Sequence, residues 1–417
     1  MNEMPSDEPR TPRTAWLVVL LLMPVAMLNY LDRQMLASMK TSVMDSIPGM
    51  GEAENPDELW GFMLGQFKWV YAVFSIIGGY LADRFSRRYA ICASLFVWSA
   101  VTVWTGQVTT YNELLWARSL MGISEAFYIP AALALIANSH SSQTRSRAVG
   151  LHQLAIYIGV IIGGFGGYAA ADPNIGWRFA FEACGVFGMF YALPLVLLLR
   201  DARSPETQIA SRNSPMHSAQ ELLTNVSFLL LVVYFTLPAM AGWVVRDWMP
   251  AILKEQFNIG QGKAGVAATL YWQVAAIVGA IVGGILADRW MQKNIRGRIY
   301  ISAMGMGMIV PAIFGVGNAG TLYVAIAFLI LFGLGWGFFD GNNMPILSQI
   351  VRPELRATGY GIMNFVSISF GGLADWGFGI LRDRQVPLSV IFGGFASLAV
   401  ISIGIVLLIR PRREIEQ

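Results

Sequence analysis

Five ionisable side chains lie inside long apolar runs in the first half of the sequence: Asp32, Arg33, Lys68, Arg118 and Glu125. An ionised group in the middle of a bilayer costs at least about 2.5–3.5 kcal/mol, so it faces a cavity or a partner by default. Arginine presents a planar fork of N–H donors to a carboxylate. Burial favours the protonated form of a carboxyl group, whereas a nearby guanidinium favours the ionised form. The pattern therefore predicts a site that binds an anion and exchanges protons.

Side-chain chemistry divides these five residues into roles. We expect Glu125 and Asp32 to take up protons, Arg33 or Arg118 to hold an anionic ligand, and Lys68 to be a third cation. Arg118 and Glu125 are two turns apart on one helix face, whereas Asp32 and Arg33 point about 100° apart. One of the latter two should therefore pair with a neighbouring helix. The alternative is that all five form interhelical ion pairs that only hold the bundle together.

The composition indicates a membrane protein. Of 417 residues, 55% are hydrophobic and 13% are charged, and the mean hydropathy is +0.53. A net charge of +3 gives no support for a nucleic-acid partner. Cys92 and Cys184 lie in apolar segments and suggest neither a disulfide framework nor a metal cluster. No nucleophile–base pair or phosphate loop stands on a water-facing segment, so we expect no enzyme, cofactor or metal.

The apolar segments predict twelve membrane-spanning helices of about 20 residues each. They are centred near Met23, Val70, Phe96, Ser124, Ile158, Gly188, Val233, Ala276, Met306, Ile330, Ser367 and Gly394. Loops and tails on the side of the N-terminus carry 19 of the Lys and Arg residues. The opposite loops carry seven: Lys40, Arg178, Arg246, Lys254, Lys263, Arg382 and Arg384. The positive-inside rule then predicts a multi-pass protein of the cell inner membrane with both termini in the cytoplasm.

An internal repeat divides the chain into two similar halves. "GYLADRFSRR" (Gly79–Arg88) returns as "GILADRWMQK" (Gly284–Lys293), 205 residues later, and "RAVG" at Arg147 returns as "RATG" at Arg356, 209 residues later. Duplicated units of this kind are typical of transporters. We therefore predict an all-α membrane protein with a six-helix bundle at 1–199, a cytoplasmic linker at 200–221 and a second six-helix bundle at 222–417.

The repeated loop resembles the major facilitator superfamily. Its G-x-x-x-D-R-x-x-R-R pattern matches at Gly79, Asp83, Arg84, Arg87 and Arg88, with Ser86 where the family usually has glycine, and a weaker copy follows in the second half. The resemblance implies that the loop carboxylates latch the two bundles on the cytoplasmic side. We therefore assign a gating role to Asp83, Arg84, Arg87, Arg88, Asp288 and Arg289, and extend it to Asp340, which lies in the cytoplasmic half of the tenth expected helix.

Two further motifs resemble one branch of that superfamily. "NYLDRQ" and "RSLMGISEAFYIPA" look like the anion:cation symporters, which carry hexuronate, galactonate and sialic acid. The resemblance implies proton uptake by Asp32 and Glu125, a substrate carboxylate on Arg33, and a supporting charge on Arg118. Spinster-like lysolipid carriers share a similar "NYLDR", with an arginine and a glutamate on the fourth helix. The sequence therefore favours proton-coupled symport of a small organic anion, with a spinster-like amphiphile carrier as the alternative.

Other polar or amphipathic residues within the spans could contact a polyol ligand, although each could instead form hydrogen bonds between helices. These candidates are Tyr30, Tyr71, Tyr128, Gln153, Tyr157, Trp272, Gln273, Asn342, Asn343, Asn364 and Ser367. The expected partners are the anion, protons and the lipid bilayer, with the protein as a monomer. Carboxylates also bind cations, so sodium is the alternative coupling ion.

Overall fold

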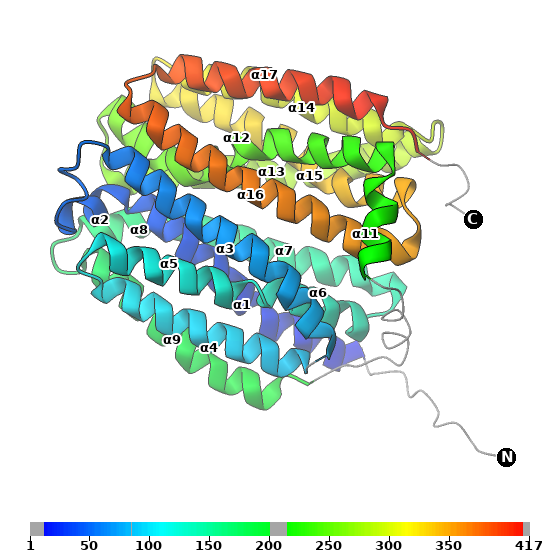
Figure 1. The fold of residues 1–417 in the computed structure, drawn as a ribbon, viewed down its shortest axis with the longest axis horizontal. Helices are drawn as coiled ribbons and strands as arrows, with labels where there is room; N and C mark the ends of the chain where they lie inside the picture. The colour runs from blue at the N-terminus through cyan, green and yellow to red at the C-terminus, as the bar shows by residue number, and fades with distance from the viewer. Residues whose placement is uncertain (1–11, 85, 201–214, 412–417) are drawn as a thin grey trace.

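The computed structural model describes residues 12–84, 86–200 and 215–411, which form α-helices, one short 3-10 helix and connecting turns. The first half contains α1 (Pro12–Ser38), α2 (Lys40–Ser46), α3 (Pro56–Arg84), α4 (Arg87–Gln107), α5 (Tyr111–Glu125), α6 (Tyr128–Ser139), α7 (Ser142–Gly164), α8 (Gly166–Ala171) and α9 (Gly176–Leu198). The second half contains α11 (Pro215–Leu223), α12 (Val226–Phe257), α13 (Gln261–Met291), α14 (Gly297–Gly317), α15 (Leu322–Ile350), η1 (Pro353–Leu355), α16 (Arg356–Asp383) and α17 (Leu388–Leu408). The long helices run roughly side by side (Figure 1).

The expected all-helical membrane fold is confirmed. In the described ranges, 11 helical stretches are long and apolar enough to cross a membrane. α16 falls outside that set because Asn364, Asp375 and several Ser and Gly residues lie along its length. It nevertheless has 28 residues and lies alongside α3 (Figure 1), in the place of the segment expected near Ser367.

Local sequence signals explain where several helices begin and end. The Thr110 side chain accepts a hydrogen bond from the Glu113 backbone N–H, and the Glu113 carboxylate accepts one from the backbone N–H of Thr110. This capping box starts α5. Asn225 and Thr321 cap α12 and α15 through their side chains. Asn258 ends α12 in the left-handed conformation, with φ of 47°, which asparagine tolerates better than most residues.

The fourth predicted span is broken near its centre. α5 ends at Glu125, two residues form a turn, and α6 starts at Tyr128, all within the stretch Tyr111–Ser139. Pro130 has no N–H to donate to the carbonyl of Ala126, and its ring crowds that carbonyl, so a regular helix cannot continue through this point. Interrupted helices at mid-membrane depth often border a transporter's binding site. The break therefore leaves Glu125 at a helix end inside the protein.

α12 is longer than the sequence predicted. It continues to Phe257, so Arg246 and Lys254, which were expected in an external loop, lie within the helix. The apolar template ended this segment too early because Arg246 and Asp247 interrupt it, although apolar residues flank them on both sides. Lys40, also expected in a loop, is the first residue of the short helix α2. The prediction that Arg246 and Lys254 lie in an external loop was therefore wrong.

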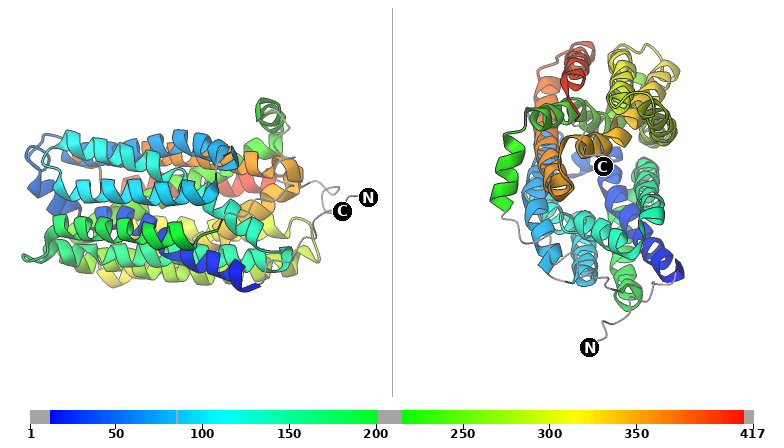
Figure 2. Two further views of the ribbon diagram at one scale, coloured as in Figure 1. Left: turned by 90° about the horizontal axis from the view of Figure 1, so that it is seen from below. Right: turned by 90° about the vertical axis from the view of Figure 1, so that its right-hand side faces the viewer.

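The two ends of the molecule differ in the elements they carry. α1 begins and α17 ends at one end, which we call the terminal end; α2 and α8 lie at the opposite end, which we call the distal end (Figures 1 and 2). Most of the predicted linker 200–221 lies outside the described residues. Its last residues already belong to α11, which packs against α12 and α16. The predicted boundary at 221 and 222 therefore falls inside a helix.

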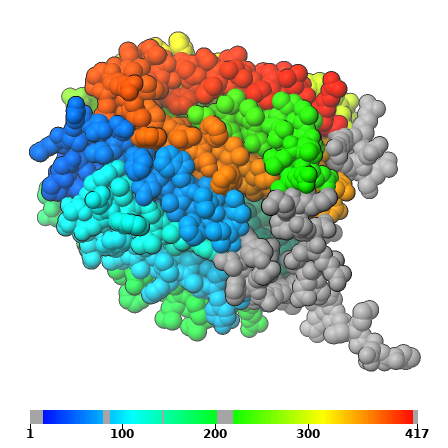
Figure 3. Space-filling view, viewed as in Figure 1, coloured from blue at the N-terminus to red at the C-terminus, as the bar shows by residue number. Residues whose placement is uncertain are grey.

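Contacts between the halves gather toward the distal end, where α3 lies against α16. A Cβ atom at Gly61 would lie 2.4 Å from the Asp375 carbonyl oxygen, and one at Gly65 would lie 2.7 Å from the Gly372 carbonyl oxygen. The two backbones therefore touch in a way that glycine alone permits. We call this contact, between residues 57–69 of α3 and 369–383 of α16, the distal seam; the two helices also meet on the surface in Figure 3.

Polar groups reinforce the distal seam. The Asp383 carboxylate accepts hydrogen bonds from the backbone N–H groups of Asp57 and Glu58, at 3.1 and 2.7 Å, and so caps the start of α3 from the other half. The Trp69 indole donates to the Ser369 carbonyl at 3.0 Å. These contacts hold the halves together at the distal end in this structure.

Candidate functional site

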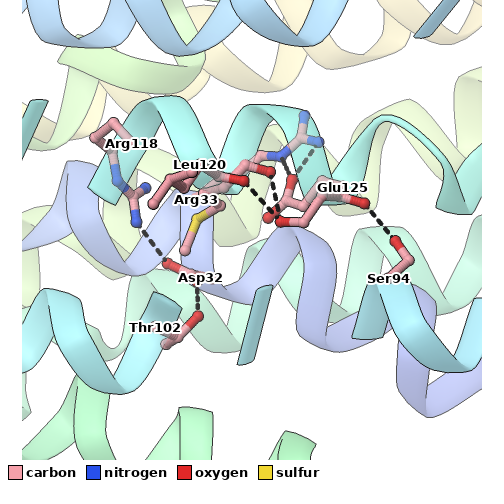
Figure 4. A network of polar contacts seen from close by, with 9 residues as sticks. Asp32, Arg33, Ser94, Thr102, Arg118, Leu120 and Glu125 are labelled. Atoms are coloured by element: carbon pink, nitrogen blue, oxygen red, sulfur yellow. Dashed lines mark hydrogen bonds and ion pairs between the residues drawn. The ribbon is translucent and has the colours of Figure 1, made fainter. Parts of the chain in front are cut away.

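The first ion pair of the site joins α1 to the helix break. Arg33 donates from Nε to Glu125 Oε2 at 2.8 Å, and its Nη2 lies 2.6 Å from the same oxygen (Figure 4). The Glu125 side chain is fully buried, and that of Arg33 is 11% exposed. Hydrogen bonds between ionised groups are shorter and stronger than neutral ones. The carboxylate in the α5–α6 break is therefore held by α1, not by Arg118 on its own helix.

The second ion pair lies beside the first. Asp32 accepts a hydrogen bond from the Thr102 hydroxyl at 2.6 Å, and Arg118 Nη2 lies 3.4 Å from the other carboxylate oxygen (Figure 4). All three residues are buried. Asp32 thus points toward α4 and α5, while Arg33 points toward the break, as their 100° separation on a helix requires. The structure brings four of the five predicted charged residues together as two neutral pairs.

Lys68 does not join this cluster. Its ammonium contacts the carboxylates of Asp247 and Asp375 in the second half, and lies 4.5 Å from the centre of the Trp243 ring. The expectation that Lys68 is a third cation of the same site was therefore wrong. The physical reason is that Lys68 lies where α3 packs against α16, so it meets the other half rather than α1.

Aromatic rings surround the Arg33 guanidinium. Its central carbon lies 5.0, 4.7 and 4.8 Å from the ring centres of Tyr30, Phe67 and Tyr71. Arg246, from the second half, lies 5.5 Å from the ring centre of Tyr30. Arginine is attracted to aromatic faces, and such rings fix its position without neutralising its charge. Guanidinium groups from both halves thus share one tyrosine at the interface.

The remaining first-half candidates separate into two places. Tyr157 and Gln153 of α7 interact with each other, and Tyr157 lies within electrostatic reach of Asp340 of α15. Tyr128 instead lies fully buried within the first half, with its hydroxyl 2.9 Å from His152 Nε2 and 3.1 Å from a backbone carbonyl oxygen of α1. Tyr128 therefore serves packing between α1, α6 and α7, contrary to its expected place in a ligand site.

Amides of the second half are buried near the interface charges. Gln273 is fully buried, and its side chain has no hydrogen-bond partner among the described residues. Asn342 donates to a backbone carbonyl of its own helix at 2.8 Å, while its Oδ1 has no partner in the described part of the chain. Asn343 interacts with Asp340. Buried polar atoms without protein partners are candidates for hydrogen bonds to a ligand or water.

Three other second-half candidates take part in contacts within that half. Asn364 interacts with Tyr360, one turn earlier on α16, and Ser367 is buried on the same helix. Trp272 packs edge-on against Trp336, with ring centres 6.5 Å apart. These residues lie at α13, α15 and α16, but no contact joins them to the Arg33–Glu125 pair among the described residues.

The first predicted gate loop is only partly visible. The side chains of Asp83 and Arg84 lie outside the described part of the structure. Arg87 is buried and donates to the Ala134 carbonyl at 3.4 Å, and Arg88 donates to a backbone carbonyl of α9. Both described arginines thus have contacts inside the first half.

The second predicted gate loop also has contacts within its own half. Asp288 pairs with Arg298 of α14 at 2.7 Å, and its carboxylate side chain is 67% exposed. Arg289 is exposed as well, whereas Asp340 lies within α15, outside this loop, and within electrostatic reach of Tyr157 of the first half. In this structure, with the distal seam closed, the Asp288 carboxylate therefore forms a local ion pair at the terminal end.

Sequence reasoning missed Arg246, Asp247 and Trp243 as site residues. The signal was present, because "VVRDW" places adjacent opposite charges inside an apolar run, as "YLDRQ" does at Asp32 and Arg33. Tyr360 and Phe67 carried no comparable signal, since aromatic residues are frequent in every apolar segment of this chain.

The geometry allows a simple exchange at Arg33. A proton on Glu125 would remove the negative charge that holds the guanidinium, which could then bind the carboxylate of a ligand in the same direction. Groups of three His, Cys, Asp or Glu that could hold a metal do not occur among the described residues.

The comparisons with known proteins agree with the fold. The family profile described as Major Facilitator Superfamily matches residues 22–374. The chain is 27% identical over 374 residues to an MFS-type efflux pump of Mycolicibacterium smegmatis, covering 89% of this chain and 85% of the relative. It is 25% identical over 410 residues to a probable L-galactonate transporter of Escherichia coli, covering 94% and 88%.

A solved structure extends the comparison to three dimensions. A bacterial homolog of the human lysosomal transporter Spinster, in an inward-facing and occupied conformation, gives a TM-score of 0.78 at 18% identity, covering 97% of both chains. At this identity the likeness shows the fold. Together with the matching profile, it establishes that this chain belongs to the major facilitator superfamily of membrane transporters and is not an enzyme.

Proposed function

We propose that the protein is a proton-coupled symporter that moves a small organic anion, such as a sugar acid, by alternating access. The observation that carries this proposal is the Arg33–Glu125 pair: a guanidinium surrounded by aromatic rings and held by a fully buried carboxylate at a helix break. An arginine in this setting stays charged and matches a carboxylate ligand.

Competition for Arg33 would couple the proton to the anion. Ionised Glu125 occupies the guanidinium, so an incoming carboxylate meets a neutral pair. Protonated Glu125 leaves the guanidinium free and the site positive. Each ligand then raises the affinity for the other by the same factor, because linkage is reciprocal. The loaded site would carry both the anion and the proton through the change of state.

Neighbouring residues support distinct parts of this proposal. Arg246 provides a second positive charge from the other half, on the ring of Tyr30. The Gln273 amide and the Asn342 Oδ1, which have no hydrogen-bond partner among the described residues, suit the hydroxyl groups of a sugar acid. Asp32 is held by Thr102 and Arg118. We therefore assign Glu125 the main proton and keep Asp32 as the second candidate.

The membrane potential sets the smallest number of protons that must enter with each anion. It is worth about 2.3 kcal/mol per charge per 100 mV, so a monovalent anion needs more than one proton to be drawn inward electrically. Glu125 supplies one binding site, and a further acidic group must supply the second. Sodium is the alternative coupling ion, which the uptake measurement below distinguishes.

A second candidate function is a spinster-like carrier of amphiphiles. The aromatic rings of Tyr30, Phe67 and Tyr71 around Arg33 also suit the boundary between an anionic head group and an apolar chain. The likeness to a spinster homolog extends over 97% of the chain. The partnerless amides of the second half favour the sugar acid instead.

We propose that the terminal end faces the cytoplasm. The loops and tails of that side carry 19 Lys and Arg residues, whereas the distal side carries five of its seven predicted ones after Arg246 and Lys254 are placed inside α12. Tags at both termini should be protected from protease in sealed right-side-out vesicles. Cleavage of either tag from outside would contradict the orientation.

A screen of the purified protein tests the substrate class. A ligand that binds the folded state raises the melting temperature. We expect galactonate, glucuronate or another sugar acid to stabilise the protein, and lysophosphatidylcholine to have no specific effect. Stabilisation by the lysolipid and by none of the acids would support the second candidate and contradict the first.

Uptake into proteoliposomes then tests the coupling. An inward proton gradient should drive accumulation of the stabilising acid without sodium, and a sodium gradient alone should not. Glu125→Gln mimics the protonated acid, so exchange of labelled substrate in preloaded vesicles should survive while gradient-driven accumulation fails. Full gradient-driven uptake by this variant would remove Glu125 from the coupling mechanism.

A further inference from the structure

A second group of buried charges joins the two halves at the base of the distal seam. Lys68 of α3 contacts Asp247 of α12 and Asp375 of α16, and Trp243 covers the ammonium at 4.5 Å. At 1.5 Å per residue, Lys68 lies about 18 Å along α3 from Pro56. The group is therefore deep between the halves. We call Lys68, Asp247 and Asp375 the interface triad.

The charges of the interface triad do not balance. Two carboxylates contact one ammonium nitrogen, so the ionised triad carries a charge of −1. The side chains of Lys68, Asp247 and Asp375 are 4%, 9% and 0% exposed. Asp375 Oδ1 is buried and has no hydrogen-bond partner among the described residues. A net charge in such a place is unfavourable, and one proton removes it.

Charged groups on the surrounding helices are engaged elsewhere. Arg246, next to Asp247 on α12, lies 4.9 Å from the Trp243 ring, and its charge acts on Asp340 of α15. On α1 and α5 the charges form the two pairs of the candidate site, Arg33 with Glu125 and Asp32 with Arg118.

Charges nearer the distal end also pair among themselves. Lys40 of α2 contacts Asp57 of α3, and Arg382 of α16 lies 2.6 Å from Glu255 of α12 and 3.9 Å from Asp57. Asp383 is held by backbone N–H groups at the start of α3, and Glu58 accepts a hydrogen bond from the Trp376 indole at 3.3 Å. The charge of −1 on the triad thus remains after its described neighbours are taken into account.

The distal seam closes the triad off from the distal side. Gly61 of α3 touches the backbone of Asp375 itself, and Gly65, one turn further, touches Gly372. Any movement that parts α3 from α16 must therefore separate Lys68 from Asp375. It would also bring water to both carboxylates, where the ionised form is stable.

We propose that Asp247 and Asp375, bridged by Lys68, form a proton-binding site that controls the distal seam. With the seam closed, the two carboxylates share one proton and the triad is neutral. When the halves part at the distal end, the proton leaves, and Lys68 loses Asp375. This site is separate from the Arg33–Glu125 pair and requires no substrate.

The direction of the pH effect follows from the number of protons that each state binds. The closed state binds one proton more than the distal-open state, so acidification favours closure and alkaline conditions favour opening. For one proton, the ratio of closed to open molecules changes by up to about tenfold per pH unit. A carrier facing acid on its distal side would therefore be drawn toward closure, in the direction that uptake requires.

Spin labels at the distal end can measure this equilibrium without substrate. Glu54 and Arg384 are exposed and belong to opposite halves, next to the ends of the distal seam. Both are changed to cysteine in a background with Cys92→Ala, Cys184→Ala and Glu125→Gln, so that Glu125 does not titrate. Distances between the labels are then recorded in lipid nanodiscs from about pH 5 to pH 8.

We expect the short-distance population to grow as the pH falls. Asp375→Asn and Asp247→Asn each leave one carboxylate for Lys68, so both variants should stay closed at every pH. Lys68→Met leaves two carboxylates without the ammonium, so its pH dependence should steepen toward two protons. Glu182→Gln changes a half-buried carboxylate on α9, away from the interface, and should keep the parent slope.

Two outcomes would overturn the proposal: a closed population that does not change with pH in the parent, or a parent-like slope in both Asp375→Asn and Asp247→Asn. If one of these variants fails to fold, the other carries the same prediction. Because no substrate is added and Glu125 is already neutral, failure here leaves the proposed symport function standing, and failure of symport leaves this test intact.

Discussion

The two groups of buried charges differ in whether their contacts lie within one half of the molecule or join the two halves. The Arg33–Glu125 and Asp32–Arg118 pairs each lie within the first half, whereas Lys68 pairs with residues of the second half. Rocking of one half against the other leaves the first two pairs intact. The same motion must break the contacts of Lys68. One group can therefore be switched only by a ligand or a proton, and the other is switched by the motion itself.

This difference suggests why a transporter would keep both groups. A charge pair inside one half fixes a binding site whose geometry is the same in every state, so specificity is preserved. The contacts of a charge cluster between the halves depend on whether the halves are closed or parted. Protonation of such a cluster can therefore make that equilibrium depend on pH. Mutations in the pairs of the first half should therefore change the affinity for the ligand. Mutations in the Lys68 cluster should change the conformational equilibrium.

The largest expected effect concerns the fork of Arg33. In Arg33→Lys the ammonium keeps the charge but loses the planar guanidinium, whose Nε and Nη2 lie 2.8 and 2.6 Å from Glu125 Oε2. We expect the affinity for the transported anion to fall by about 10- to 100-fold, since hydrogen bonds to charged groups contribute about 1.5–3 kcal/mol. Isothermal titration calorimetry with the acid found in the screen would measure it.

Arg118→Lys is the matched control for that variant. Arg118 reaches Asp32 with one nitrogen at 3.4 Å, a contact that lysine can approximate. The affinity of Arg118→Lys for the transported anion should fall less than that of Arg33→Lys. Equal losses would place the anion between both arginines, and an unchanged affinity in Arg33→Lys would move the anion site elsewhere.

The second prediction acts on the interface between the halves. Gly61→Ala places a Cβ atom 2.4 Å from the Asp375 carbonyl oxygen, so the distal seam can close only after a backbone shift. Overpacking of this kind costs about 1–3 kcal/mol. We expect label distances at the distal end to shift toward the open population, with anion affinity of the Arg33 site little changed.

Gly394→Ala on α17 is the control, because a Cβ atom there meets nothing within 4 Å. It should leave the distal distances unchanged. A seam that closes as well in Gly61→Ala as in the parent would show that α3 and α16 are not in backbone contact.

The smallest expected effect is at the terminal end. Asp288 pairs with Arg298 in its own half, and its carboxylate side chain is 67% exposed. Exposed ion pairs contribute about 0–1 kcal/mol. Asp288→Asn should therefore change the free energy of unfolding by less than about 1 kcal/mol in denaturant titrations. A larger loss would mean that this pair holds the fold together and is not free to exchange partners as a gate.

Much of the fold could be predicted from the sequence because the bilayer imposes strong rules. Long apolar runs gave the helices, including α16 near Ser367, and the repeated "LADR" loop indicated two related halves. The limits of α12 could not be found in this way. Its charged residues Arg246 and Asp247 interrupt the apolar pattern, and only their partners in the folded protein make their burial acceptable.

The site was predicted less completely, for a physical reason. Helical periodicity shows that the side chains of Asp32 and Arg33 point in different directions. The sequence of this one segment is therefore enough to predict that they pair with different helices. The partner of Lys68 depends on how α3 lies against α12 and α16, a contact between distant parts of the chain. The position of Tyr128 has the same origin, since a tyrosine with apolar neighbours fits either a cavity wall or a packed interior.

The most direct test of the proposed mechanism is the pH dependence of anion binding to the parent and to Glu125→Gln, measured by calorimetry with the acid found in the screen. If ionised Glu125 competes with the anion for Arg33, the parent should bind more tightly as the pH falls from about 8 to about 5.5, because protonation frees the guanidinium. Glu125→Gln should bind tightly at both ends of that range. Parallel pH profiles in the two proteins would contradict the account and show that Glu125 and the anion do not compete for Arg33.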